Sequence, residues 1–176
     1  MTVLRTRRLV LRPKGANDAD AMHEIASRGE VVRWTASWPW PPDREFTEAR
    51  AAAPQPERGL VAMILLDGRP VGMASAVNEE LGYMLHPSAW RRGLATEACA
   101  ALLHHWFATT DASGIGAGVF EGNPASVRVL EKLGFRETGR SPFPCRALGR
   151  EADGIDFHLG REGWLRRAVE FGPPTA

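Results

Sequence analysis

A change of hydrophobic period between residues 79 and 98 constrains this chain more than any other feature. Apolar and more polar or smaller residues alternate over 80–86, as is typical of a half-buried strand. Pro87 then ends the strand, because proline has no backbone N–H to donate. From Leu94 the apolar residues recur at helical spacing, which predicts a helix to about residue 108. A strand therefore leads through an Arg-Arg-Gly turn into a helix N-terminus.

The turn formed by Arg91, Arg92 and Gly93 has the features of a phosphate site. A helix N-terminus carries unpaired N–H groups and the positive end of the helix dipole, and both stabilise a phosphate. Gly93 lets a ligand approach the backbone closely, and the two arginines add fork-shaped donors. The alternative interpretation is a pair of solvated arginines at the start of a helix.

The string Glu-Leu-Gly-Tyr-Met-Leu-x-Pro-x-x-Trp-Arg-Arg-Gly-Leu-Ala-Thr-Glu-Ala resembles the coenzyme A site of the GCN5-related N-acetyltransferases (GNAT), in the branch that includes RimJ and RimL. The family pattern is Gln/Arg-x-x-Gly-x-Gly/Ala. Gly93 and Ala95 match it, whereas Trp90 occupies the first position. Only the backbone and the neighbouring arginines can then serve as pyrophosphate ligands. The resemblance implies an acetyl-CoA site at Arg91, Arg92, Gly93, Leu94, Ala95 and Thr96.

A second motif covers residues 123–135, with Asn123 as helix cap, proline at the first helical position and glycine just past the end. Its Asn-x-x-Ser and Glu-Lys-Leu-Gly-Phe parts resemble the family's second motif, which implies a pantetheine contact for Asn123. Many family members carry a Tyr where this chain has Leu130. We therefore consider the Ser126 hydroxyl as the group that hydrogen-bonds the thiolate, with completion of the helix cap as the alternative.

Length and composition bound the remaining possibilities. A chain of 176 residues suits one domain, which we place at 1–171 with a frayed tail at 172–176. A net charge of +1 gives no argument for a nucleic-acid or membrane partner. The two cysteines imply no disulfide framework, and we find no metal-ligating constellation. Without a signal-peptide pattern we expect a cytoplasmic protein; its oligomeric state stays open, a homodimer included.

Further elements follow from periodicity and turn residues. We expect a helix from a cap at Asn17 or Asp18 to about Ser27, ended by Gly29, and a second helix over 43–53. The glycine run in 114–120 lacks the third glycine of a dinucleotide fingerprint, so we interpret it as a strand whose bare face permits close packing. Other predicted segments are strands over 8–12, 60–66, 70–77, 135–139 and 155–159, a helical turn over 30–34, and a long loop over 140–153.

The resemblance implies an α/β fold of the α+β type, with a mostly antiparallel central sheet of about seven strands flanked by helices. It also implies that strand 80–86 splays away from strand 114–120 and that the pantetheine arm enters the gap. Backbone N–H groups near Met84 and Leu85 would then polarise the thioester carbonyl. The implied reaction is direct transfer of acetyl from acetyl-CoA to a primary amine, either a protein N-terminal α-amine or a small-molecule amine.

A base must remove a proton from the ammonium form of the acceptor. Glu80, His86 and Glu79 lie on or beside the splayed strand and are the candidates. Tyr83 on the same strand is interpreted as a core residue. A non-catalytic acyl-CoA-binding or sensing module is the alternative function, because Leu130 replaces the usual Tyr.

The acceptor site is predicted from loops rather than motifs. Trp38 and Trp40 lie in a proline-rich loop, where large rings either fold back as a small core or form a wall of the binding groove. In the family this segment lies over the acceptor. We therefore take Trp38, Trp40 and Arg146 as candidate substrate contacts, which favours an acceptor with an apolar part and a carboxylate or phosphate.

Overall fold

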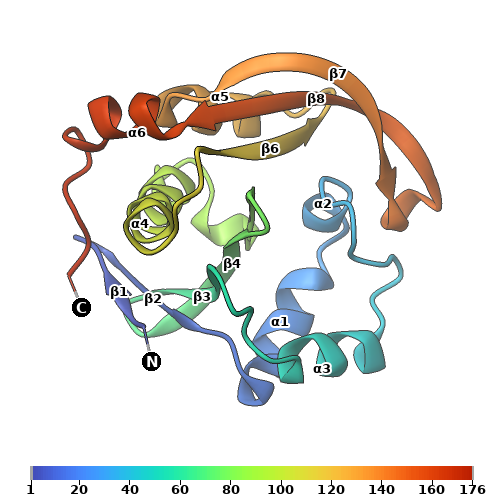
Figure 1. Ribbon diagram of the computed structural model, residues 1–176. Coiled ribbons are helices and arrows are strands. Elements are labelled where there is room, and N and C mark those ends of the chain that lie inside the picture. Colours follow the sequence, from blue (N-terminus) through green and yellow to red (C-terminus); the bar gives the residue numbers. More distant parts are fainter. Residues whose placement is uncertain (1, 176) are drawn as a thin grey trace.

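The sheet organises the whole molecule. In the computed structural model, which describes residues 2–175, eight strands lie in the order β1-β2-β3-β4-β5-β6-β8-β7 (Figure 1). All neighbouring strands are antiparallel except β5 and β6, which are parallel. The strands are β1 (Leu4–Arg5), β2 (Leu9–Pro13), β3 (Leu60–Leu66), β4 (Arg69–Val77), β5 (Glu80–Leu85), β6 (Gly114–Phe120), β7 (Arg136–Cys145) and β8 (Arg150–Gly160).

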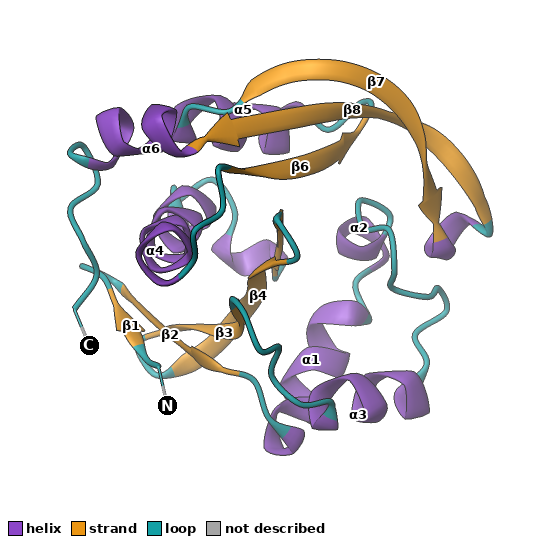
Figure 2. Cartoon of the chain, in the orientation of Figure 1, coloured by secondary structure: helices purple, strands orange, loops and turns teal. Residues whose placement is uncertain are grey.

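Helices cover the sheet in two groups (Figure 2). One hydrophobic cluster lies between the sheet and α4, α5 and α6; a second lies between the sheet and α1, α2 and α3. The mostly antiparallel sheet flanked by helices is confirmed, and the two-residue β1 raises the strand number above the predicted seven. The helices are α1 (Ala19–Ala26), α2 (Gly29–Val32), α3 (Arg44–Ala52), α4 (Leu94–Thr109), α5 (Pro124–Leu133) and α6 (Arg161–Ala168). No helix within residues 2–175 is both long and apolar enough to cross a membrane.

Helix caps explain why several predicted boundaries are confirmed. The Asp43 carboxylate accepts a hydrogen bond from the Phe46 N–H at the start of α3 (2.9 Å), and Asn123 does the same for Ser126 in α5 (3.2 Å). Gly134 ends α5 in the left-handed region, with φ of 95°. These short-range interactions need no tertiary information.

The bare face predicted for the glycine run is also confirmed. A Cβ on Gly118 would lie 2.8 Å from the Phe143 ring, and one on Gly154 of β8 would lie 2.2 Å from it. Glycine at these positions therefore lets the Phe143 ring approach β6 and β8 closely.

Two parts of the C-terminal third differ from expectation. The predicted loop over 140–153 is wrong: β7 and β8 form a long hairpin there, with Pro142 opposite Asp153 and Pro144 opposite Glu151. Prolines are tolerated because β7 is the edge of the sheet, where an N–H is not needed on one side. In the tail that we expected to fray, Thr175 exchanges two backbone hydrogen bonds with Arg5 (2.8 and 3.0 Å); Ala176 lies outside the described residues.

The start of α1 also differs from expectation. Asp18 lies just before α1, but its carboxylate does not cap that helix. It accepts hydrogen bonds from Arg12 Nη1 and Nη2 (2.8 and 2.6 Å) and from the Gly15 N–H (2.8 Å). At the other end, Gly29 begins α2 instead of ending α1. Burial alone would raise the pKa of Asp18, but these hydrogen bonds outweigh it and lower the pKa below its ordinary value.

We expect Asp18→Asn to lower the free energy of unfolding by about 1–2 kcal/mol at pH 7, since it weakens hydrogen bonds to a buried charge. A lowered native pKa stabilises the fold above the ordinary pKa, and this stabilisation is lost as pH falls through the native value. Urea unfolding should therefore show a gap between variant and wild type that closes below about pH 3. The exposed Asp20, which pairs with Arg44 at 2.7 Å, supplies the control Asp20→Asn, expected to cost under about 0.5 kcal/mol. A difference in the free energy of unfolding that does not change with pH would contradict the lowered pKa of Asp18.

Candidate active site

The site begins where the two parallel strands separate. Glu80 pairs with Gly116, and the Gly116 N–H donates to the Glu79 carbonyl (2.7 Å). No later residue of β5, whose six residues are all described, pairs with β6. The predicted splay is therefore present in the structure, closed at the start of β5 and open toward its end.

The register of β5 shows which backbone groups face the gap. The His86 N–H donates to the Val71 carbonyl (2.8 Å), and Met84 lies opposite Met73. Alternate residues of an antiparallel ladder exchange hydrogen bonds with their neighbour, so the Met84 N–H points to β4. The N–H of Leu85 points the other way, toward the gap. Of the two predicted carbonyl-polarising groups, the geometry favours Leu85.

Trp90 lies beside the open end of the splay. Its indole Nε1–H donates to the Leu85 carbonyl (2.9 Å), while its ring stays partly exposed. The residue that departs from the family pattern thus holds the backbone of β5 in place. The N–H of Leu85 is left facing the gap.

The predicted phosphate turn lies at the N-terminus of α4. Gly93 is in the left-handed region (φ 73°), and Arg91 also has a positive φ of 59°. Among the described residues no side chain caps α4, so the first-turn N–H groups are available to an anion. Arg91, Arg92 and Gly93 are exposed, as a contact with a soluble pyrophosphate requires. Leu94, Ala95 and Thr96 form the first turn of α4.

Arg8 is a residue of this site that the sequence did not reveal. Its Nη1 donates to the Arg92 carbonyl (2.9 Å), and its Nε donates to Glu97 Oε2 (2.7 Å). Glu97 also accepts from the Thr6 hydroxyl (2.6 Å). Burial would raise the pKa of Glu97, but the bonds from Thr6 and Arg8 lower it. Arg8 thus neutralises the one acidic side chain in the first turn of α4.

The second motif places Ser126 near the gap. Asn123 Nδ2 donates to Ser126 Oγ (3.2 Å), so Oγ already has a donor and its own proton is free to donate elsewhere. Capping the helix and donating to a thiolate are therefore compatible roles for one residue. Leu130, one turn later, is fully buried in the core. Apolar packing explains why Leu occupies this position.

Tyr83 connects the two walls of the splay. Its hydroxyl donates to the Ser126 carbonyl (3.4 Å), and its ring packs against the cluster under α4. Desolvation raises the pKa of Tyr83 above its ordinary value, with a smaller contribution from Cys99. The phenol therefore stays protonated, in keeping with the predicted packing role.

The candidate bases lie at opposite ends of β5. His86 Nδ1 accepts from the Ser88 N–H (3.2 Å), and Nε2 lies 3.2 Å from Glu24 Oε1, although not aligned for a hydrogen bond. Nδ1 is thus engaged by Ser88, and Nε2 lies against the Glu24 carboxylate without a hydrogen bond. Glu80 stands at the closed end of the splay, exposed, and no side-chain partner is found for it among residues 2–175. Glu79, beside it, is likewise exposed.

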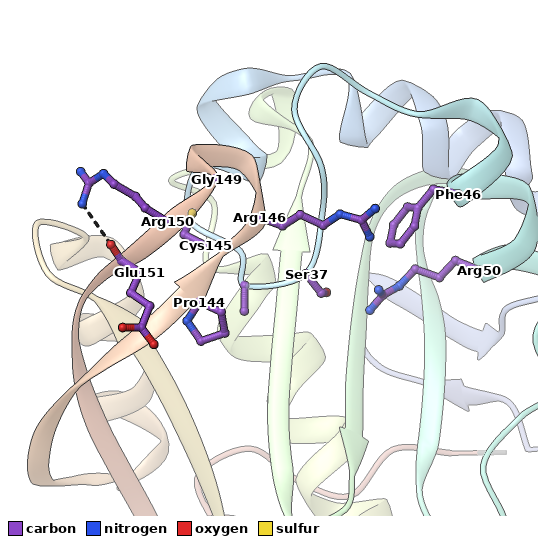
Figure 3. Close-up of a pocket in the computed structure, with 10 residues that line it drawn as sticks. Ser37, Phe46, Arg50, Pro144, Cys145, Arg146, Gly149, Arg150 and Glu151 are labelled. Atoms are coloured by element: carbon purple, nitrogen blue, oxygen red, sulfur yellow. Dashed lines mark hydrogen bonds between the residues drawn. The ribbon is translucent and has the colours of Figure 1, made fainter.

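The structure separates the three predicted substrate contacts. Trp38 is 6% exposed and packs edge-on against Phe46, which favours the packing role. Trp40 is exposed and lies against Gly29 on α2. Arg146 lines a hollow of about 510 Å³ between α3, the loop before α3 and the tip of the β7–β8 hairpin (Figure 3).

Phe46 and Arg50 of α3 line the same hollow and were not predicted. They stand four residues apart and so share one face of the helix. Within residues 2–175 no cluster of three or more His, Cys, Asp or Glu side chains could hold a metal ion.

Comparison with known proteins identifies the family. Residues 8–136 match the model of the acetyltransferase (GNAT) domain family. The uncharacterized N-acetyltransferase YoaA of Bacillus subtilis is 30% identical over 149 residues, covering 78% of this chain and 84% of YoaA.

Two solved structures are similar in fold. RimJ of Mycobacterium smegmatis, in complex with CoA-disulfide, has a TM-score of 0.72 at 24% identity and covers 98% of this chain and 94% of its own. AAC(6')-Ib, in complex with ribostamycin and coenzyme A, has a TM-score of 0.74 at 19% identity, over 90% of this chain and 97% of its own. The predicted resemblance is confirmed: the chain belongs to the GNAT family, and it is an acetyltransferase whose co-substrate is acetyl-CoA.

Proposed function

We propose that the chain transfers acetyl directly from acetyl-CoA to a primary amine held beside β5, without an acyl-enzyme intermediate. The observation that carries this proposal is the separation of β5 from β6 after the single pair Glu80–Gly116. A pantetheine arm in that gap can pair with the edge of β5 while its pyrophosphate lies at the start of α4. Arg91 and Arg92 add charge at that end.

Two groups of this chain act on the thioester in the proposed reaction. The Leu85 N–H donates to the thioester oxygen and stabilises the negative charge that develops there. The amine nitrogen bonds to the carbonyl carbon, and the carbon–sulfur bond then breaks. The Ser126 hydroxyl donates to the departing thiolate, which leaves as coenzyme A once it is protonated.

The amine must lose a proton, and we assign its removal to Glu80 acting through a chain of waters, because Leu85 stands five positions further along β5. Glu80 shares a face of β5 with Met84, which packs against the cluster formed with α1 and Trp38. That face is the acceptor side in this proposal. The ring of His86 is occupied by Ser88 and by the neighbouring Glu24, so it is a poorer candidate.

The acceptor is proposed to be a small-molecule amine or a protein N-terminus. The two similar structures hold different ligands, ribostamycin with coenzyme A in AAC(6')-Ib and CoA-disulfide in RimJ, so neither fixes the acceptor of this chain. Release of coenzyme A from acetyl-CoA in the presence of a panel of primary amines tests the proposal. Binding of acetyl-CoA without turnover by any amine would favour the non-catalytic module instead.

We expect Gly93→Ala to weaken coenzyme A binding about tenfold, because its Cβ would stand in the open space where a phosphate approaches the N–H groups. Of the described atoms, only Arg8 Nη2 lies within 4 Å of that Cβ, at 3.7 Å. Gly68 in the β3–β4 turn has a similar φ of 77°, and no described atom lies within 4 Å of a built Cβ. Gly68→Ala therefore carries the same backbone strain, about 1 kcal/mol, away from the site. Calorimetric titration with coenzyme A should show weaker binding by Gly93→Ala than by Gly68→Ala. Equal affinities of the two variants would refute the phosphate site at Gly93.

Ser126→Ala should lower kcat about tenfold or more, since the leaving thiolate loses its donor. The dissociation constant of coenzyme A should stay unchanged, because the donor acts only as charge develops on sulfur. Ser126→Thr retains the hydroxyl and serves as the control. A normal kcat for Ser126→Ala would leave the serine as a helix cap only.

Glu80→Gln should reduce kcat/KM about a hundredfold near neutral pH, as expected for loss of a positioned base. Part of the activity should return at higher pH, where more of the acceptor amine is already neutral. His86→Gln and Glu79→Gln are the comparison variants and should retain most activity. If His86→Gln shows the larger loss, the assignment of the base to Glu80 is wrong.

A further inference from the structure

The hollow beside α3 holds two guanidinium groups that face one another. Figure 3 shows Arg146, from the tip of the β7–β8 hairpin, and Arg50, from α3, pointing toward each other beside the Phe46 ring. The Arg146 guanidinium lies 4.4 Å from the centre of that ring and the Arg50 guanidinium 5.7 Å from it. The hairpin tip is held there by the Arg146 N–H, which donates to the Ala36 carbonyl (3.0 Å).

Neither guanidinium has an acidic partner among residues 2–175. Of the described side chains that line the hollow, only Glu151 carries a carboxylate, and Figure 3 shows it on the far side, beyond Pro144. Desolvation and the neighbouring charge of Arg146 both lower the pKa of Arg50. Both residues are exposed, so water screens much of the repulsion between the two like charges, and both guanidinium groups are accessible to a ligand.

Another arginine of the same helix is neutralised by carboxylates. Arg44 pairs with Asp20 (2.7 Å) and with Glu48 one turn later (2.6 Å). Arg50 instead has Phe46 one turn before it and Pro54 four residues after it, so no carboxylate is supplied by helical spacing. Arg50 is left available to a ligand.

We propose that Arg50 and Arg146 bind an anionic group of the acceptor, so that the substrate is a primary amine that also carries a carboxylate or a phosphate. Two guanidinium forks on either side of a hollow suit a planar carboxylate or a phosphate, each of which takes paired N–H donors. This inference rests on the proposed amine acetylation and specifies its acceptor class.

The walls of the hollow are partly apolar, which suits the part of the acceptor that joins its amine to its anionic group. Phe46 and Pro144 supply apolar surface, and the hollow of about 510 Å³ has the size of a small-molecule site. Trp38 lies beneath Arg50, with 5.0 Å from the guanidinium to the ring centre, and it packs in the same cluster as Met84 of β5. An acceptor anchored at Arg50 and Arg146 can therefore extend its amine toward the strand that faces the thioester.

Matched acceptors test the charge requirement with the intact protein and saturating acetyl-CoA. Phenylalanine is compared with its methyl ester and with phenethylamine, O-phosphoethanolamine with ethanolamine, and spermidine serves as a polycation. We expect kcat/KM to be at least tenfold higher for each anionic acceptor than for its neutral counterpart, with spermidine the poorest. Equal rates, or preference for spermidine, would overturn the inference while leaving amine acetylation intact.

Substitutions of the two arginines test whether they cause the preference for anionic acceptors. Arg50→Gln and Arg146→Gln should each raise KM for the anionic acceptor about tenfold and leave the neutral acceptor unchanged. Arg44→Gln, on the same helix but paired with Asp20 and Glu48, is the control and should have no such effect. Loss of activity on all acceptors alike would indicate misfolding of the hairpin tip, and it would count against a role for these arginines in charge recognition.

A binding measurement separates this inference from the proposed function. N-acetylphenylalanine carries the carboxylate but no reactive amine, so its binding needs no turnover. Calorimetry should show binding by the wild type that is lost in Arg50→Gln and in Arg146→Gln, whereas N-acetylphenylalanine amide should not bind. If this pattern holds and no amine is acetylated, the anion site stands and the proposed function fails. If neither compound binds, the anion site is refuted.

Discussion

One backbone contact determines where β5 and β6 separate, and with it where the proposed chemistry takes place. Asn78 and Glu79 form a tight turn between β4 and β5, with φ of 52° and 60°, and the turn presents the Glu79 carbonyl to the Gly116 N–H. The parallel strands separate directly after this contact. Unpaired N–H and C=O groups are costly when buried, so the gap is a place where a ligand with amide groups gains backbone hydrogen bonds. A pantetheine arm carries such amides.

In the proposed reaction, the two-residue period of β5 lets a single strand serve both substrates. Leu81 and Leu85 pack into the cluster under α4, the side on which the cofactor turn and Ser126 lie. Met84 packs into the cluster with α1 and Trp38, on the acceptor side. Successive side chains of a strand point to opposite faces, so backbone groups between them stand at the junction of the two substrates. The Leu85 N–H occupies that junction.

Much of the fold could be predicted because local signals determine it. The change of period near residue 87, the cap at Asn123 and the glycines of β6 act over a few residues and do not depend on distant parts of the chain. The β7–β8 hairpin was missed because its prolines and arginines suggest a loop. β8 pairs with β7 over residues 150–158 and with β6 over residues 154–160. The pairing with β6 joins segments that are far apart in the sequence, so no short window of sequence contains it.

The candidate site likewise has one part that local sequence signals predict and another that depends on tertiary contacts. On the cofactor side, the proposed anion-binding groups are mainly backbone N–H groups at one helix terminus, so a short motif was enough to predict them. Arg8 was missed there because it reaches Arg92 from 84 positions away. On the acceptor side, Arg50 and Arg146 come from separate elements and meet only after the hairpin tip docks on the loop before α3. In this proposal, acceptor recognition depends on side chains that the sequence keeps apart. Exchanging the hairpin tip would then change the acceptor without disturbing the cofactor turn.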